Sequence, residues 1–177
     1  MLSTQYIAIA LALTVVMAAV YTDLKHGKIY NKLTFPVIAV GLLLGGMASG
    51  LDGFLFSLRG LFVASLSVFL FLAYQLIGGG DAKLLLAVGA LMGPNFALYT
   101  LLYTALSGGL IAILALARRR ILGATLHRFG EGALYAAVYR TPVVLLSGPR
   151  AGHIPYSIAI ATGVALAMAT GHAQAIL

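Results

Sequence analysis

The chain contains several long apolar segments, which few folds other than a membrane helix bundle can accommodate. A helix needs about 20 apolar residues to cross the hydrocarbon of a bilayer. Segments of that kind cover residues 4–22, 34–51, 59–77, 95–117 and 154–172. Only 8% of the 177 residues are charged, whereas a soluble domain typically has about 25%, and the mean hydropathy is +1.04. We therefore predict an all-α, polytopic membrane protein that forms a single domain over residues 1–177.

A sixth apolar segment, residues 82–93, is shorter than the others and ends at Pro94. At about 1.5 Å per residue a helix of this length covers about half of a bilayer, so we expect it to face protein rather than lipid. Counting it gives six helices. The prolines are expected in the opening turns of helices, where a missing N–H has little effect; they are Pro36, Pro94 and Pro155. Residues 118–153 contain basic residues and a helical apolar stripe, which predicts an interfacial helix.

The distribution of basic residues predicts the orientation of the chain. If the N-terminus lies outside, all of the 11 Lys and Arg residues except Arg59 fall on the cytoplasmic side, as the positive-inside rule requires. The same orientation places Asp23 and Asp81 together at the cytoplasmic face and Asp52 at the opposite face. The basic residues alone give this orientation, so the placement of both aspartates at one face is independent support for a shared site.

Acidic residues are rare in this chain, since only four occur in 177 positions. Asp23 and Asp81 each lie where an apolar segment meets a basic loop, and carboxylates at such positions are usually functional. The structural alternatives are an N-cap for Asp81 and an interfacial ion pair for Asp23. Cysteine is absent, which excludes disulfides, thiolate metal sites and a cysteine nucleophile. The four histidines are scattered, and we expect no metal and no cofactor.

Two carboxyl groups that share a site do not both ionise easily, so one keeps its proton. The charged partner can take a proton from a water that attacks a peptide carbonyl, while the neutral partner donates a hydrogen bond to the carbonyl oxygen. This is aspartic protease chemistry. Asp81 opens a helix, whose dipole favours a negative charge, and Asp23 lies near a helix end, where it does not. Our hypothesis is therefore that Asp81 carries the charge and Asp23 the proton.

Residues around the two aspartates are candidates for shaping the site or binding a substrate. They are Gly78, Gly79, Gly80, Lys83, Asn31 and Lys25. Three glycines in a row form an ordinary turn, but their bare backbone also lets a substrate strand approach Asp81. Lysines near helix ends are more typical of snorkelling anchors than of catalytic groups. Asn31 can cap the second helix or orient the site.

The sequence resembles the type IV prepilin peptidases, which are membrane aspartic peptidases. Residues 78–84, GGGDAKL, match the G-x-G-D-x-K-L signature of that family. Asp23, followed by Ile-Tyr-Asn at residues 29–31, matches the family's first aspartate and its I-P-N element, with Tyr30 in place of the usual proline. Ile-Pro-Tyr at residues 154–156 resembles the opening of the family's last helix.

The resemblance implies that Asp23 and Asp81 are catalytic and that no cofactor takes part. It implies cleavage of the short basic leader of pilin or pseudopilin precursors, after a glycine, at the cytoplasmic face of the bacterial inner membrane. With 11 residues, 23–33, joining the first two helices and no cysteine, the chain is similar to the short, Flp-type members, without the N-terminal cysteine domain linked to methylation. The expected partners are the precursor and membrane lipid, with no nucleic acid; the oligomeric state stays open.

Functions from other classes remain possible on the sequence alone. A proton- or cation-coupled transporter also uses membrane carboxylates, but it favours a midplane pair between broken helices. A non-catalytic subunit of a secretion or pilus assembly system would tolerate asparagine at both aspartates. A protease with a different substrate, such as a signal peptide, would be separated from these only by a substrate test.

Overall fold

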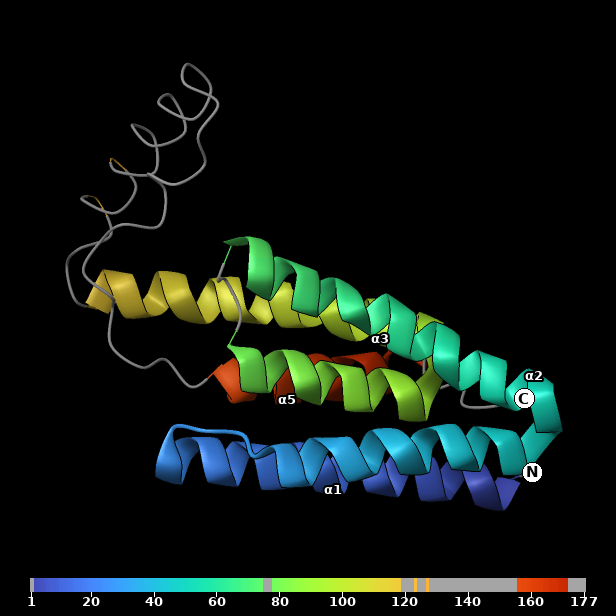
Figure 1. The fold of residues 1–177 in the computed structure, drawn as a ribbon. Coiled ribbons are helices and arrows are strands. Elements are labelled where there is room, and N and C mark those ends of the chain that lie inside the picture. Colours follow the sequence, from blue (N-terminus) through green and yellow to red (C-terminus); the bar gives the residue numbers. More distant parts are fainter. Residues whose placement is uncertain (1, 75–77, 119–122, 124–126, 128–155, 172–177) are drawn as a thin grey trace. The chain divides into compact units, whose positions relative to one another are not determined.

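In the computed structural model, residues 2–74, 78–118, 123, 127 and 156–171 are described, and all regular elements among them are helices. In chain order they are α1 (Leu2–His26), α2 (Asn31–Tyr74), α3 (Gly79–Arg118) and α5 (Tyr156–Ala169) (Figure 1). The prediction of an all-α fold is confirmed. The predicted interfacial helix at 118–153 lies almost entirely outside the described residues.

Both long helices contain a break in their backbone geometry. In α2 the break is at Ser49 and Gly50, where Gly50 has φ 63°, and in α3 it is at Gly93, with φ 80°. Glycine adopts positive φ without the steric penalty of a Cβ atom. Pro94 follows directly and begins the next helical segment, as predicted. Residues 31–118 therefore form four helical segments, apart from the residues 75–77 that are not described.

Two boundaries differ from the sequence prediction. The connection between α1 and α2 is Gly27–Tyr30, which is shorter than the predicted 23–33, because α1 continues to His26 and α2 already begins at Asn31. Helix α2 therefore begins before the predicted start, and Pro36 lies inside it rather than in its opening turn. Residues 52–58, between two of the predicted apolar segments, are helical, and the backbone of α2 departs from helical geometry at Ser49 and Gly50.

Three described helical stretches are long and apolar enough to cross a membrane. They are Thr4–His26, Asn31–Phe69 and Gly79–Arg118, and Tyr156–Ala169 is a shorter apolar helix. Large apolar side chains are exposed along them, including Leu43, Met47 and Phe62. Side chains of this kind are stable when they face lipid, so the chain is a multi-pass membrane protein.

The chain divides into two compact units, residues 1–108 with 155–177 and residues 109–154. Both aspartates belong to the first unit. Its core is formed by the short segment of α3 before Gly93, in which Leu84, Val88 and Leu91 are fully buried. This confirms that residues 82–93 face protein. The segment packs with buried residues of α1 and α5, and Figure 1 shows α5 and the beginning of α3 side by side.

Small residues allow the helices of this unit to approach closely. A Cβ atom at Gly41 would lie 2.9 Å from the backbone carbonyl carbon of Ala90, and one at Gly89 would collide with the backbone oxygen of Gly60. A Cβ atom at Gly163 would meet α3 at Thr104. Close packing of this kind is a main source of helix association in membranes, where lipid tails are as apolar as the helix surface.

Candidate active site

Asp23 lies in the last turn of α1, which Gly27 ends. Gly27 has φ 63°, and its N–H donates to the carbonyl oxygen of Asp23 at 2.7 Å. A glycine in this conformation is a common helix terminator because it satisfies an otherwise unpaired carbonyl. The Asp23 side chain is 5% exposed. The end of α1 therefore holds a buried carboxyl group in a fixed backbone position.

The side chain of Asp23 is bonded to α5. The Ser157 hydroxyl donates to Asp23 Oδ2 over 2.6 Å, and Ser157 is completely buried. The two residues are 134 positions apart in the chain. This hydrogen bond ties the end of the first helix to the beginning of the last one.

Asp81 lies in the first turn of α3, as predicted, and follows the three glycines. The Ala82 N–H donates to the Gly78 carbonyl at 3.0 Å, which closes that turn. A Cβ atom added at Gly78 would lie 2.6 Å from Asp81 Oδ2, so the carboxyl group folds back over Gly78. Absence of a side chain at Gly78 therefore makes room for the carboxyl group, and the helix N-terminus favours its negative charge.

The glycine run packs directly against the connection between α1 and α2. A Cβ atom at Gly80 would lie 2.9 Å from the Cβ atom of Ile29 and 3.4 Å from its backbone nitrogen. Gly79 is the first residue of α3. The contact at Gly80 brings the segment that follows Asp23 against the segment that precedes Asp81. Two motifs separated along the chain thus meet at one end of the unit.

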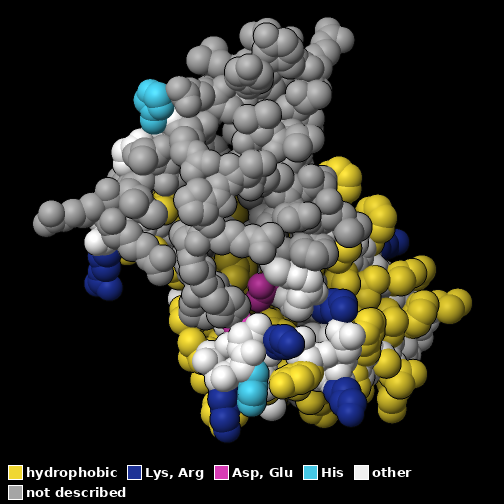
Figure 2. Space-filling view, turned by 60° about the vertical axis from the view of Figure 1, so that its left-hand side comes forward, with side chains coloured by type: hydrophobic (Ala, Val, Ile, Leu, Met, Phe, Trp, Pro, Cys, Tyr) yellow, Lys and Arg dark blue, Asp and Glu magenta, His cyan; other side chains and the backbone are white. Residues whose placement is uncertain are grey.

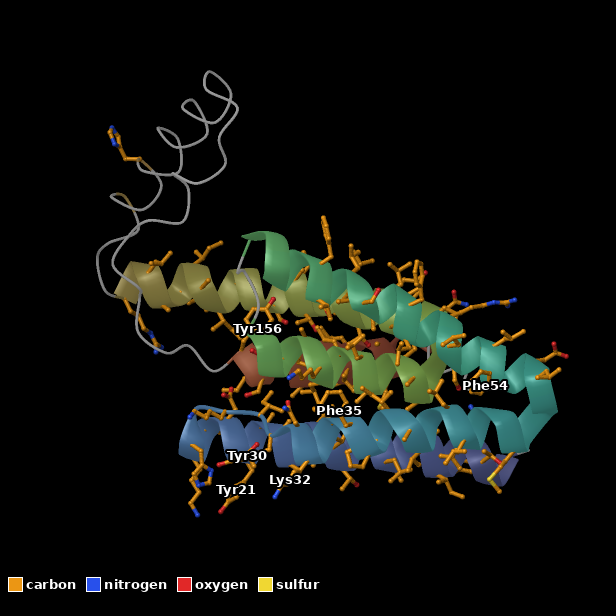
Figure 3. The ribbon with its side chains drawn as sticks, in the orientation of Figure 1. Tyr21, Tyr30, Lys32, Phe35, Phe54 and Tyr156 are labelled. Carbon is orange, nitrogen blue, oxygen red and sulfur yellow. The ribbon has the colours of Figure 1, made fainter. Side chains whose placement is uncertain are left out.

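Two of the predicted site-shaping residues are joined to each other. The Lys83 ammonium group donates to Asn31 Oδ1 at 2.8 Å and lies 5.6 Å from the centre of the Phe35 ring. Lys25 instead contacts Tyr21, with 3.3 Å between Nζ and the phenol oxygen. In Figure 3 the Tyr21 side chain points away from α5. The structure thus places Asn31 and Lys83 beside the glycine run, and Lys25 apart from them.

Tyr156, the first residue of α5, lies on the Asp81 side of the site. The negative charge of Asp81 acts on the Tyr156 phenol, and the Tyr156 ring packs on α3 at Gly108, where an added Cβ atom would be 3.0 Å from Cε2. Figure 3 shows Tyr156 toward the same end of the helices as Tyr30, and Phe54 near the other end. The first turn of α5 thus contacts Asp23 through Ser157 and carries Tyr156 within range of the Asp81 charge.

Sequence reasoning did not assign a site role to Tyr156 or Ser157. Tyr156 was recognised only as part of the Ile-Pro-Tyr motif, and Ser157 is one of many hydroxyl residues in apolar segments. The signal that could have found Ser157 is its position directly after that motif, in the first turn of the last helix.

Basic side chains lie near an acidic one on one face of the molecule. Figure 2 shows an acidic side chain on this face with Lys and Arg side chains beside and below it. Among the described residues, no three His, Asp or Glu side chains come together in a group that could hold a metal ion. The chemistry available from the described side chains here is that of two carboxyl groups, hydroxyls and lysines.

Comparison with known proteins identifies the family of this chain. Residues 10–113, more than half of the chain, match the type IV leader peptidase family. The chain belongs to this family. The matched region contains both aspartates and the glycine run, but it ends before α5.

One curated protein is similar to this chain. The prepilin peptidase EppA of Methanothermobacter thermautotrophicus is 35% identical over 107 residues, which cover 57% of this chain and 28% of EppA. The alignment therefore spans little more than a quarter of that relative. No solved structure matches the chain.

Proposed function

We propose that this type IV leader peptidase family member removes the short basic leader from Flp-type or related pilin precursors by an aspartyl dyad of Asp23 and Asp81. One observation supports this most directly: the two segments that carry these aspartates touch at Gly80 and Ile29. The first turn of α5 also contacts Asp23 through Ser157, and Tyr156 in the same turn is within range of the Asp81 charge. The four-residue connection between α1 and α2 supports the short, Flp-type form.

The proposed reaction is hydrolysis of one peptide bond by an activated water. The ionised carboxyl group, which we assign to Asp81, takes a proton from the water as its oxygen bonds to the peptide carbonyl carbon. The protonated Asp23 donates a hydrogen bond to the carbonyl oxygen. When the tetrahedral intermediate collapses, the C–N bond breaks and the leaving amine accepts a proton from the dyad. Site-resolved carboxyl NMR in which Asp23 ionises first would contradict this assignment.

The surroundings of the dyad suit a substrate that is a helix on one side of the cut and extended on the other. The apolar helix of a pilin precursor would stay in lipid beside the exposed apolar side chains of the enzyme. The extended junction would lie against the glycine run, where bare backbone leaves room for a second strand. Lys83 lies next to that run and is a candidate for meeting an acidic residue of the substrate.

We further propose that the dyad faces the cytoplasm and that the N-terminus lies outside. The basic residues Lys28, Lys32 and Lys83 lie close to the dyad in the chain, whereas Asp52 follows the break in α2. Figure 3 shows Lys32 and Phe54 toward opposite ends of the helices, with Phe54 near the bend of α2. Basic residues concentrate on the cytoplasmic side of membrane proteins, which supports this orientation in a bacterial inner membrane.

Co-expression with a pilin precursor tests the proposal. The precursor should carry a basic leader that ends in glycine, and its size should be followed on a gel. We expect the unchanged protein and an Asp52→Asn variant to process it, and Asp23→Asn and Asp81→Asn to leave it intact. Asp52 is a matched control because it is an exposed aspartate directly after the break in the middle of α2. Processing by both dyad variants would refute the mechanism. Failure of the unchanged protein on several precursors would favour a transporter or an assembly subunit, and a proton-flux assay in liposomes would separate these two.

A further inference from the structure

The first turn of α5 contributes a group to the site that neither the glycine signature nor the family match assigns. Ser157 lies outside residues 10–113, the matched region. Its hydroxyl is nevertheless 2.6 Å from a carboxyl oxygen of Asp23, and both side chains are buried. A hydrogen bond of this length to a buried carboxyl group is strong, because water does not compete for either partner.

We propose that Ser157 is a positioning residue of the dyad, which fixes the rotation of the Asp23 carboxyl group. This inference rests on the proposed peptidase function. The terminal torsion of an aspartate side chain has broad, shallow preferences. A donor held at Oδ2 therefore decides how the carboxyl plane is turned toward the substrate. Reaction rates depend steeply on such orientation.

The position of Ser157 in the fold makes it suited to this role. Its neighbour Tyr156 packs on α3 at Gly108 and lies within the electrostatic reach of Asp81. The beginning of α5 is thus anchored on the segment of α3 that follows the break at Gly93, and from there Ser157 reaches the helix that carries Asp23. The first turn of α5 is therefore one of the contacts that hold the Asp23 carboxyl group in place.

Ser107 provides a matched control within the same unit. Its hydroxyl also joins α5 to another helix, since it lies 3.1 Å from the carbonyl oxygen of Ala159 and 2.8 Å from that of Tyr103. These bonds of Ser107 go to backbone carbonyls and not to a carboxyl group. Replacement of Ser107 by alanine removes the same group and a comparable link between helices that does not involve Asp23.

Steady-state cleavage of a pilin precursor by purified protein provides the first test. We expect Ser157→Ala to lower kcat by about 5- to 100-fold, the range for leaving a buried acceptor without its hydrogen-bond partner, with KM unchanged. Ser157→Thr, which keeps the hydroxyl, should recover part of the loss, and Ser107→Ala should cleave like the unchanged protein. A wild-type kcat in Ser157→Ala, or an equal loss in Ser107→Ala, would overturn the proposal.

Infrared spectroscopy of the resting protein, labelled with ¹³C at aspartate carboxyl carbons, gives a second test that needs no cleavage. The band of Asp23 is identified as the one that disappears in Asp23→Asn. We expect Ser157→Ala to shift this band and Ser107→Ala to leave it in place. An unmoved band in Ser157→Ala overturns the inference even if the protein cleaves. If Ser157→Ala shifts the Asp23 band but the unchanged protein cleaves no precursor, the contact between Ser157 and Asp23 is supported and the proposed peptidase function is refuted.

Discussion

Asp81 and Asp52 occupy similar local positions, in the first turn of a helical segment that follows a glycine, yet their surroundings differ. Asp52 comes two residues after the break at Gly50 and is exposed. Asp81 is half-buried, folds back over Gly78 and lies near Tyr156. The difference teaches that a glycine followed by an aspartate at a helix start is only a local structure. It becomes a candidate active site where other helices bring a second carboxyl group and a shielded environment to it.

The largest expected difference between Asp81 and Asp52 is in catalysis. Loss of an acid or base from a dyad typically lowers a rate by about 10²- to 10⁴-fold, so we expect a fall of this size in Asp81→Asn. Asp52→Asn should cleave at the wild-type rate. Cleavage rates of the two purified variants on one pilin precursor measure this contrast. Equal rates would show that the two aspartates do not differ in function.

Replacing the glycines that precede the two aspartates by alanine should have different effects, on the cleavage rate at Gly78 and on stability at Gly50. In Gly78→Ala the new Cβ atom would lie 2.6 Å from Asp81 Oδ2, and a carboxyl group moved by about 1 Å can cost about 10²-fold in rate. Gly50 has φ 63° and ψ −134°, with open space around an added Cβ atom, so Gly50→Ala should cost about 1–3 kcal/mol in stability and leave the rate unchanged.

Thermal unfolding in detergent and cleavage rates, measured on the same preparations, separate these two effects. A Gly78→Ala variant that is destabilised but fully active would contradict the placement of the Asp81 carboxyl group. An inactive Gly50→Ala variant that remains folded would show that the break in α2 affects catalysis.

A smaller effect is expected at the contact between the glycine run and the first connection. Gly80→Ala brings a Cβ atom within 2.9 Å of the Ile29 Cβ atom, and overpacking of this kind costs about 1–3 kcal/mol. We expect a lower unfolding temperature and about tenfold slower cleavage, since about 1.4 kcal/mol corresponds to tenfold in rate. Gly46 is the control, because the nearest atom to an added Cβ there is 3.9 Å away. A Gly80→Ala variant with unchanged stability and rate would show that the contact between Gly80 and Ile29 does not hold the site together.

The smallest effect is expected at the lysine beside the glycine run. Lys83→Gln removes the ammonium group that binds Asn31, and an exposed pair of this kind contributes less than about 1 kcal/mol. We therefore expect stability to change little, kcat to stay constant and KM to rise less than about fivefold. Arg59→Gln, at an exposed position of α2, should alter neither constant. A fall in kcat for Lys83→Gln would place the lysine in the chemistry.

Much of the fold could be predicted because apolar segments in a membrane have few alternatives to the helix. The sequence placed helices at the positions of all the described elements and assigned residues 82–93 to the protein interior. The predicted apolar segments ended at residue 51 and resumed at 59, whereas residues 52–58 are helical. A single aspartate among apolar residues is compatible with a helix, and the break lies at Ser49 and Gly50.

Two properties of this protein follow from its sequence alone. Its scarcity of charge requires helices that face lipid, and its few carboxylates, at Asp23 and Asp81, mark the candidate site because isolated charges are costly near hydrocarbon. Only the tertiary structure brought Ser157 to Asp23 and Ile29 to Gly80. Contacts between residues so far apart depend on how helices pack, and small residues permit several packings that local sequence does not distinguish.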